Sequence, residues 1–281
     1  MKITRGQTAG WEAAFKGMRN PKNSWSKSDS IFGIFSCDDD PDYDVASDWT
    51  YKHLKNQEYD EEQEDYDEQY DKYFEKYDIW LLRNGVIQAS ETSDCYELAL
   101  LGHDDLSLAQ RLIFAGPEHC KFLRQITISC DITAPLYWWK EMDTYKIGTV
   151  ADSTSTMHKL TSVPITIDSF EMNDLDENMM MYENDPYNPD IYMSEFWDML
   201  INDLEHLRKK YNETKDQRYW KELIRLLPES WLQTRTWSAN YAVLRNIYLQ
   251  RKNHKLSEWH TFCDWIKTLP YANELILCKI D

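Results

Sequence analysis

Residues 126–159 read ITISCDITAPLYWWKEMDTYKIGTVADSTSTMHK, and this stretch decides the fold. Its first seven residues alternate β-branched and polar side chains, which predicts a central strand at 126–132. Ala134-Pro135 is predicted to end this strand, and 136–145 to form a helix. Residues 149–159 are rich in small hydroxyl residues and have no periodicity, which indicates a loop.

This hydroxyl-rich loop is a candidate phosphate site. Backbone N–H groups and hydroxyls in such a loop can surround a phosphate. Lys146, His158 and Lys159 add positive charge beside it. The alternative is an ordinary surface loop, with Trp138 and Trp139 as core residues.

The flanking sequence predicts a mixed α+β chain. N-terminal to the central strand, a helix is expected at 11–18, a loop at 20–30, a hairpin at 79–88 around Asn84-Gly85 and a strand at 96–101. A helix at 106–115 is expected, capped by Asp105 or Ser107, and another from Pro117 to about residue 124. C-terminal to it, the patterns predict a weak strand at 165–167, an acidic surface excursion at 171–191, and helices at 194–211, 216–227, 239–252, 257–268 and 271–277.

No dinucleotide or phosphate-loop motif and no β-α-β alternation occurs, which disfavours doubly wound folds. We therefore predict an α+β fold in which residues 1–281 form a single domain. Hydrophobic residues make up 42% of the chain and aromatic residues 14%, enough for a sizeable core. The six cysteines lie far apart and without zinc spacing, which predicts a reducing compartment and no metal site.

The net charge of −18 argues against nucleic-acid binding, and no run of about 20 apolar residues predicts a membrane span. Without a signal sequence at the N-terminus, a soluble cytoplasmic protein is expected. The charge is concentrated: residues 36–78 contain 17 acidic and 4 basic residues, so the rest carries only about −5. An anionic nucleotide can therefore still find a local basic pocket.

Residues 37–78 form an acidic insertion, and five tyrosines in it recur at spacings of seven, four, three and four, which predicts one helical stripe. They are Tyr59, Tyr66, Tyr70, Tyr73 and Tyr77. The stripe is interpreted either as a docking helix for a basic partner or as a solvated acidic helix that lays its tyrosines on the domain.

A second informative stretch, 226–259, reads LLPESWLQTRTWSANYAVLRNIYLQRKNHKLSEW. It contains Leu-Pro, then Asn240, Asn246 and Arg251, then His254 and Trp259. Together with the Ala-Pro strand end and the hydroxyl loop, this order of motifs resembles the flavin-dependent thymidylate synthases. Their signature R-H-R-x-x-S-x-N-E-x-S-x-R-Y follows the helix after Ala-Pro. The resemblance covers roughly 108–276, and phage-type relatives are the expected source.

The match is residue by residue and incomplete. Thr144-Tyr145-Lys146 stands at R-H-R, so two of its three basic positions are lost, and Thr156 stands at the last Arg. Thr149 and Thr154 fall on the two serines and Asp152 on the Glu. Glu118-His119 repeats a family Glu-His pair, although a capped helix start explains it equally well.

The resemblance implies site residues for a flavin and for a nucleotide. The cofactor-binding set is Asn246, Lys146, Tyr145, His119 and Asn240. The substrate-binding set is Arg251, Glu141, Thr149, Asp152, Ser153, Thr154, Ser155, His158 and Lys159. Asn246 and Arg251 are expected on one helical face, with the Asn buried; the alternative is a helix with an exposed Arg.

The family fold implies a central antiparallel sheet flanked by helices and a homotetramer. The activity implied is one-carbon (methyl or hydroxymethyl) transfer to C5 of a pyrimidine deoxynucleotide, dUMP or dCMP, with FAD and a tetrahydrofolate donor. No protein nucleophile is required, and the chemistry belongs to the cofactor. Two alternatives remain: a non-catalytic nucleotide-binding or sequestering protein on the same fold, and an interaction protein that works through its acidic helix.

Overall fold

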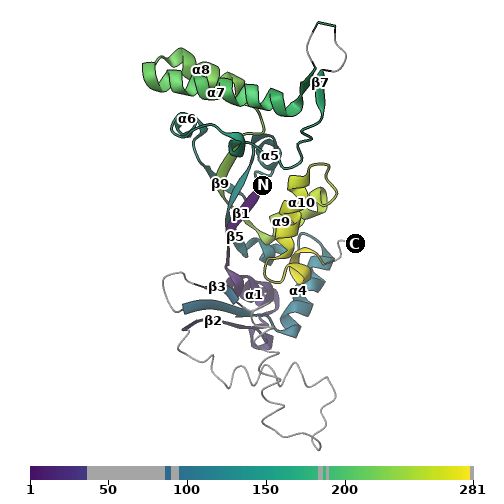
Figure 1. Ribbon diagram of the computed structural model, residues 1–281. Helices are drawn as coiled ribbons and strands as arrows, with labels where there is room; N and C mark the ends of the chain where they lie inside the picture. The colour runs from purple at the N-terminus through teal and green to yellow at the C-terminus, as the bar shows by residue number, and fades with distance from the viewer. Residues whose placement is uncertain (37–85, 90–94, 183–185, 188–189, 279–281) are drawn as a thin grey trace, which may run out of the picture. The chain divides into compact units, whose positions relative to one another are not determined.

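The computed structural model describes residues 1–36, 86–89, 95–182, 186–187 and 190–278 (Figure 1). The predicted acidic insertion, its tyrosine stripe and the Asn84-Gly85 turn lie outside these residues. The chain divides into two compact units. Unit 1 contains residues 1–5 and 130–237, and unit 2 contains residues 6–129 and 238–281. The single domain stays a prediction.

A four-stranded sheet has the order β1 (Lys2–Ala9), β5 (Thr127–Pro135), β9 (Leu232–Asn240) and β6 (Val150–Ser153). The predicted α+β class, with a central antiparallel sheet flanked by helices, is confirmed. β5 is the predicted central strand, and it ends at Pro135 as expected. The loop predicted at 149–159 is wrong, because β6 and the short helix α6 (Thr156–Lys159) occupy most of it.

Three cross-strand side-chain pairs define the register of β5 against β9. Ser129 and Ser238 lie 2.8 Å apart, Thr133 and Thr234 2.7 Å apart, and the Thr236 hydroxyl donates to Asp131 at 2.6 Å. The two numbers of each pair have the same sum, which is the register of an antiparallel pair. One face is therefore a polar ladder. The alternate residues of β5, among them Ile128 and Ile132, are buried.

Unit 2 contains a second antiparallel sheet of order β2 (Ile31–Ser36), β4 (Cys95–Leu100) and β3 (Val86–Ala89). Helix α1 (Trp11–Arg19), the predicted first helix, buries Trp11 and Phe15. The Trp11 ring lies 5.3 Å from the Tyr241 ring, edge to face, and 5.7 Å from the Tyr271 ring. Tyr271 in turn accepts a hydrogen bond from Leu101 N at 2.9 Å. This aromatic cluster joins segments that lie far apart in sequence.

Helix α4 (His103–Ala115) starts three residues earlier than predicted, and neither Asp105 nor Ser107 caps it. Its first turn is capped from a distant segment, because the Asp29 carboxylate accepts from Asp104 N at 2.8 Å and from Asp105 N at 3.0 Å. The helix predicted from Pro117 is limited to a 3-10 turn, Lys121–Arg124.

Unit 1 buries its apolar residues under a helical hairpin, α7 (Met193–Thr214) and α8 (Gln217–Leu226), which Figure 1 shows side by side. The two helices contribute Leu204 and Leu223 to a cluster of buried residues whose other members are Leu160, Ile165, Phe170 and Trp231. The strand predicted at 165–167 is wrong, since a 3-10 turn, Ile167–Ser169, follows the buried Ile165. The excursion contains a small sheet of β7 (Met180–Tyr182) and β8 (Ile191–Tyr192).

The remaining C-terminal helices follow the predictions. They are α9 (Tyr241–Arg251) and α10 (Ser257–Lys267), and a π-helical segment, Ala272–Ile276, stands where the last helix was expected. Among the helices described, none is long and apolar enough to cross a bilayer.

Candidate functional site

The fourteen predicted site residues divide between the two units. Ten lie in unit 1, from Glu141 to Lys159, and four in unit 2: His119, Asn240, Asn246 and Arg251. Each group is described by itself below.

Helix α5 (Leu136–Met142) positions the first group and is shorter than the predicted helix. Leu136 N donates to Trp231 O at 3.1 Å, so the start of α5 is held by the segment before β9. The buried Trp139 indole donates to Gln233 O at 2.9 Å. After Met142 the chain turns, leaving Glu141 and Tyr145 half-buried and Lys146 exposed.

Residues 149–155 form the signature region, and their hydroxyls are not equally able to donate a hydrogen bond to a phosphate. Thr149 donates its hydroxyl to Tyr145 O, and Thr154 donates to Thr234 O at 3.1 Å. Ser155 accepts from His158 N at 3.3 Å as the cap of α6, and its own proton remains to donate. Ser153 is exposed on the edge strand β6. Of these four side chains, Ser153 and Ser155 are therefore the two whose hydroxyls are suited to donate a hydrogen bond to a phosphate.

Charged side chains surround these serines in the sequence. Asp152 is exposed on β6, and His158 and Lys159 are exposed on α6, one turn or less from Ser155. Lys146 is exposed before the turn at Gly148, whose φ of 78° is a left-handed conformation suited to glycine. Three basic side chains and one carboxylate thus flank a strand edge and a short helix.

Arg235 on β9 is a candidate that the sequence reasoning missed. Its guanidinium lies 4.2 Å from the Trp139 ring centroid, donates to Gln233 at 2.9 Å and pairs with Asp143 at 2.7 Å. Gln233 also donates to Thr154 O at 3.0 Å, which joins this cation to the signature region. The available signal was the alternation of residues 233, 235 and 237, which places all three side chains on one face of a strand.

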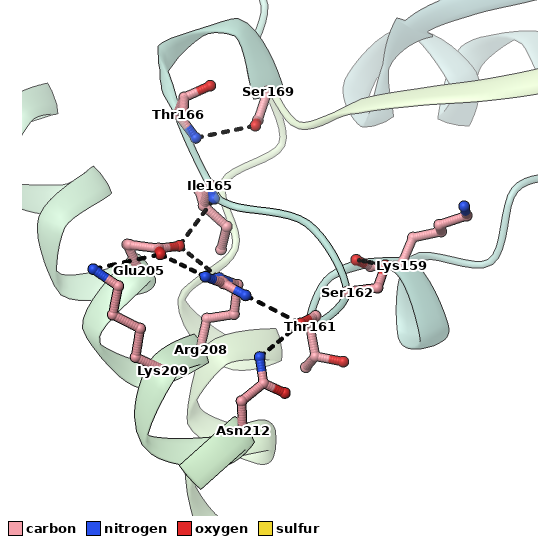
Figure 2. A network of polar contacts seen from close by, with 10 residues as sticks. All are labelled: Lys159, Thr161, Ser162, Ile165, Thr166, Ser169, Glu205, Arg208, Lys209 and Asn212. Carbon is pink, nitrogen blue, oxygen red and sulfur yellow. Dashed lines mark hydrogen bonds and ion pairs between the residues drawn. The ribbon is translucent and has the colours of Figure 1, made fainter.

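The chain that follows α6 is anchored to α7 by a polar network (Figure 2). Thr161 O accepts from Arg208 at 3.3 Å and from Asn212 at 2.8 Å. Glu205 accepts from Ile165 N at 3.0 Å and holds a two-bond pair with Arg208 at 2.6 and 2.7 Å. The hydrogen bonds from Arg208 and the Ile165 amide lower the pKa of Glu205 to about 2. The network therefore fixes where α6 ends.

This network predicts acid-sensitive stability. Because the pKa of folded Glu205 is about 2 and its ordinary value is 4.5, its stabilising contribution is present above pH 4.5 and is lost as pH falls towards 2. Glu205→Gln is expected to lower the free energy of unfolding by about 2 kcal/mol at neutral pH and to flatten its fall in acid. Urea unfolding at a series of pH values measures both effects.

The matched control is Glu213→Gln, which removes an exposed carboxylate from the same helix. It is expected to leave the stability and its pH dependence nearly unchanged. If the free energy of unfolding of Glu205→Gln fell as steeply in acid as that of the wild type, Glu205 would not be the source of the acid sensitivity.

In unit 2, helix α9 carries three of the four candidates. Asn240 caps the helix, and its side chain accepts from Val243 N at 3.1 Å. Asn246 is exposed and accepts from Gln250 at 2.9 Å, so the expectation that it is buried is wrong. The buried face of α9 contains Tyr241, Leu244 and Ile247, which leaves position 246 outside it. Asn246 and Arg251 are five residues apart, about 140° around a helix, rather than on one face.

Arg251 ends α9 against α10. Its guanidinium lies 4.6 Å from the ring centroid of the buried Trp259, and the His254 ring lies 6.1 Å from the same indole. A guanidinium over an indole ring can still offer its planar fork of N–H donors to a phosphate or carboxylate. His119 is exposed in the turn after α4, and its backbone N–H donates to Gly116 O at 3.0 Å.

Two of the described cysteines, Cys130 and Cys263, are buried. Burial raises the pKa of the Cys130 thiol to about 12 and that of Cys263 to about 11, so both are neutral thiols at physiological pH. No cluster of three or more His, Cys, Asp or Glu side chains suited to a metal ion occurs among the described residues.

Comparison with known proteins identifies solved structures with a similar fold. No family model matches the chain, and no curated protein matches it in sequence. Among solved structures, the flavin-dependent thymidylate synthase from Helicobacter pylori, complexed with FAD and dUMP, aligns over 98% of both chains with a TM-score of 0.53 and 14% identity. The fold is thus that of a flavin-dependent thymidylate synthase, as the resemblance predicts.

Two further structures align over less of the chain. A second Helicobacter pylori structure of thymidylate synthase X with FAD and dUMP covers 64% of this chain and 84% of its own, at 18% identity and a TM-score of 0.45. The UMP/dUMP methylase from Streptomyces cacaoi, bound with 5-Br UMP, covers 63% and 83%, at 11% identity and a TM-score of 0.45.

Proposed function

We propose that this chain, which has the fold of the flavin-dependent thymidylate synthases, transfers a one-carbon group to C5 of a pyrimidine deoxynucleotide, dUMP or dCMP, with FAD. The group transferred is a methyl or hydroxymethyl, and a tetrahydrofolate is the proposed donor. The observation that carries the proposal is the alignment over 98% of both chains with an enzyme complexed with FAD and dUMP. In line with the family, we propose a cytoplasmic homotetramer.

The donor set fits an anionic nucleotide. Ser153 and Ser155 supply hydroxyl donors, the exposed Lys146 and Lys159 supply positive charge, and the exposed His158 supplies an imidazole ring. Asp152 beside them is suited to accept from a sugar or base N–H or O–H group. These residues would hold a phosphate and orient the base, while Thr149 and Thr154 shape the backbone through their hydrogen bonds to carbonyls.

A flavin, when bound, would supply the reducing equivalents. In this chain Tyr145, Lys146, His119, Asn240 and Asn246 are the residues we assign to its binding. Tyr145 offers an aromatic face, and the exposed amide of Asn246 offers both a donor and an acceptor. Asn240 acts through the backbone, because its side chain is used in capping α9.

The first test is an absorbance spectrum of freshly purified protein, before and after addition of FAD and removal of the excess. Retained flavin, followed by turnover of dUMP or dCMP with a tetrahydrofolate donor, is the expected result. A colourless protein that retains no flavin, even with nucleotide present, would overturn the proposed reaction.

One observation favours a second function, nucleotide binding without catalysis. Thr144 and Tyr145 replace two basic residues of the R-H-R signature, and the Thr144 hydroxyl only closes the turn by donating to Glu141 O at 2.7 Å. A sequestering protein would keep the phosphate contacts without a flavin. Co-purified nucleotide in a colourless preparation is the result expected for it.

Glu141 tests the choice of base. It stands where the resemblance expects Gln, and a carboxylate can accept from the exocyclic amino group of cytosine. Glu141→Gln is expected to shift the preference from dCMP towards dUMP by roughly 10-fold, about 1.4 kcal/mol. Binding of the two nucleotides to wild type and variant, measured by calorimetry, gives this ratio.

The matched control is Glu229→Gln, which changes a carboxylate that pairs with Lys140. It is expected to leave the ratio unchanged. An unchanged ratio in Glu141→Gln itself would remove the basis for a cytosine nucleotide as substrate.

A further inference from the structure

The segment between Lys159 and Arg208 has a composition found nowhere else in the chain. Residues 160–207 contain 12 Asp and Glu and no Lys or Arg. They also contain six of the ten methionines of the protein. Negative charge alone keeps an acidic segment solvated and does not require methionine. The combined enrichment in acidic residues and methionine therefore needs a separate explanation.

Three of these methionines, Met179, Met181 and Met199, are exposed at the surface of unit 1, and the other three are half-buried. Strand β7 pairs with β8 through Met180 and Tyr192, and Met193 N donates to Met179 O at 2.7 Å. Ser194 also donates to Glu177 O at 3.2 Å. These bonds attach the small sheet to the first turn of α7, so that the sheet and the helix start form one structural element.

Large apolar side chains are exposed on this element. We define the Met/Tyr surface as Met179, Met181, Tyr187, Tyr192 and Met199, whose exposed fractions range from 39% to 92%. Tyr192 is the N-cap residue of α7, and Met199 lies in the second turn of the same helix. Exposed apolar residues that gather in this way mark an interaction site.

The carboxylates beside this surface have no cationic partner among the described residues, although Asp176 accepts from Asn178 N at 3.0 Å and Glu195 accepts from Tyr192 N at 3.0 Å. Asp174, Asp176, Glu177, Glu195 and Asp198 are exposed, and none of them forms an ion pair with a described residue. By contrast, two other acids of the segment are paired: Glu171 with the N-terminal amine at 2.7 Å and Glu205 with Arg208. The unpaired carboxylates therefore surround the apolar side chains with negative charge.

We propose that the Met/Tyr surface binds a cationic amphipathic segment of a partner protein, a helix with one apolar face and flanking Lys or Arg residues. Methionine is flexible and polarisable, and it adapts to varied apolar side chains at binding surfaces. The surrounding carboxylates select positive charge in the partner and repel nucleic acid and anionic lipid. The surface contains none of the proposed nucleotide residues, and the proposal does not depend on their function.

The test uses the full chain and a synthetic amphipathic helix made of leucine and lysine. The control peptide has the same composition in an order that breaks the apolar face. The amphipathic peptide is expected to bind at least 10-fold more tightly than the scrambled one, and its affinity is expected to fall with added salt. With 13C-labelled methionine methyl groups, the signals of Met179, Met181 and Met199 should shift, while the buried Met18 and Met142 should not.

The double variant Met179→Gln, Met181→Gln is expected to weaken peptide binding by at least 10-fold. Met157→Gln, an equally conservative change at another exposed methionine, is the control and should have no effect. Equal binding of both peptides, or unchanged affinity in the double variant, would overturn the proposal. Self-association of the free protein that the double variant abolishes would also overturn it, because the occupant would then be a second copy of the chain.

Discussion

Asp105→Ala is expected to lower the free energy of unfolding by about 3–5 kcal/mol, a large share of the stability of an ordinary domain. The Asp105 side chain is fully buried and accepts from Arg19 Nε at 2.5 Å. It also accepts from the hydroxyls of Ser28 and Ser30 at 2.6 and 2.5 Å. Removing the carboxylate leaves a buried guanidinium without its charge partner and two serines without their acceptor.

Urea unfolding followed by tryptophan fluorescence measures the effect, and two variants sharpen it. Asp104→Ala removes the neighbouring carboxylate, whose side chain is 76% exposed, and is expected to change stability by less than about 1 kcal/mol. The double variant Arg19→Met, Asp105→Leu removes both buried charges and is expected to recover much of the loss. A single variant as stable as wild type would show that the ion pair contributes nothing.

The same residue shows why sequence patterns misplaced the start of α4. Asp105 has the chemistry of a helix cap and stands at the right distance from the apolar run, so local rules select it. The structure uses Asp29 for the cap instead and places Asp105 in a buried network. All three residues that Asp105 contacts in that network, Arg19, Ser28 and Ser30, lie more than 70 residues away, and no local pattern contains them.

Strand prediction succeeded where one face was apolar and failed elsewhere. β5 has buried Ile128 and Ile132 in alternation with polar residues, which gives the period-two signal. β9 was missed because Gln233 and Arg235 occupy the face that also contains Trp237, so polarity does not alternate cleanly. β6 was missed because all four of its residues are exposed at the sheet edge. Pairing with the neighbouring strand β9, rather than a pattern in its own sequence, makes β6 a strand.

The candidate site was partly predictable for the same reason. Residue type and order along the chain indicated the hydroxyl region and Arg251. They did not show which hydroxyl protons are already donated to carbonyls, as those of Thr149 and Thr154 are. They also placed Asn246 in the interior, whereas the apolar spacing of α9 puts it in solvent.

Arg251→Ala is expected to weaken pyrimidine nucleotide binding by roughly 100-fold or more, about 2.7 kcal/mol, while leaving the protein folded. This expectation rests on the proposed function. The resemblance assigns the nucleotide contact to this residue, and the structure holds its guanidinium 4.6 Å from the Trp259 ring. Loss of the cation–π contact alone is expected to lower stability by only about 1 kcal/mol, because Trp259 stays buried. Calorimetric titration with dUMP and dCMP measures the binding change, and urea unfolding measures the stability change.

Two matched variants separate charge from geometry at this position. Arg251→Lys keeps the positive charge but loses the planar, two-bonded contact, so an intermediate affinity is expected. Lys255→Ala removes an exposed cation shortly after α9 and is expected to leave nucleotide affinity within about 2-fold of wild type. If Arg251→Ala binds nucleotide as tightly as wild type, the end of α9 is not part of the nucleotide site. In that case the contact between Arg251 and Trp259 joins α9 to α10 and has only a structural role.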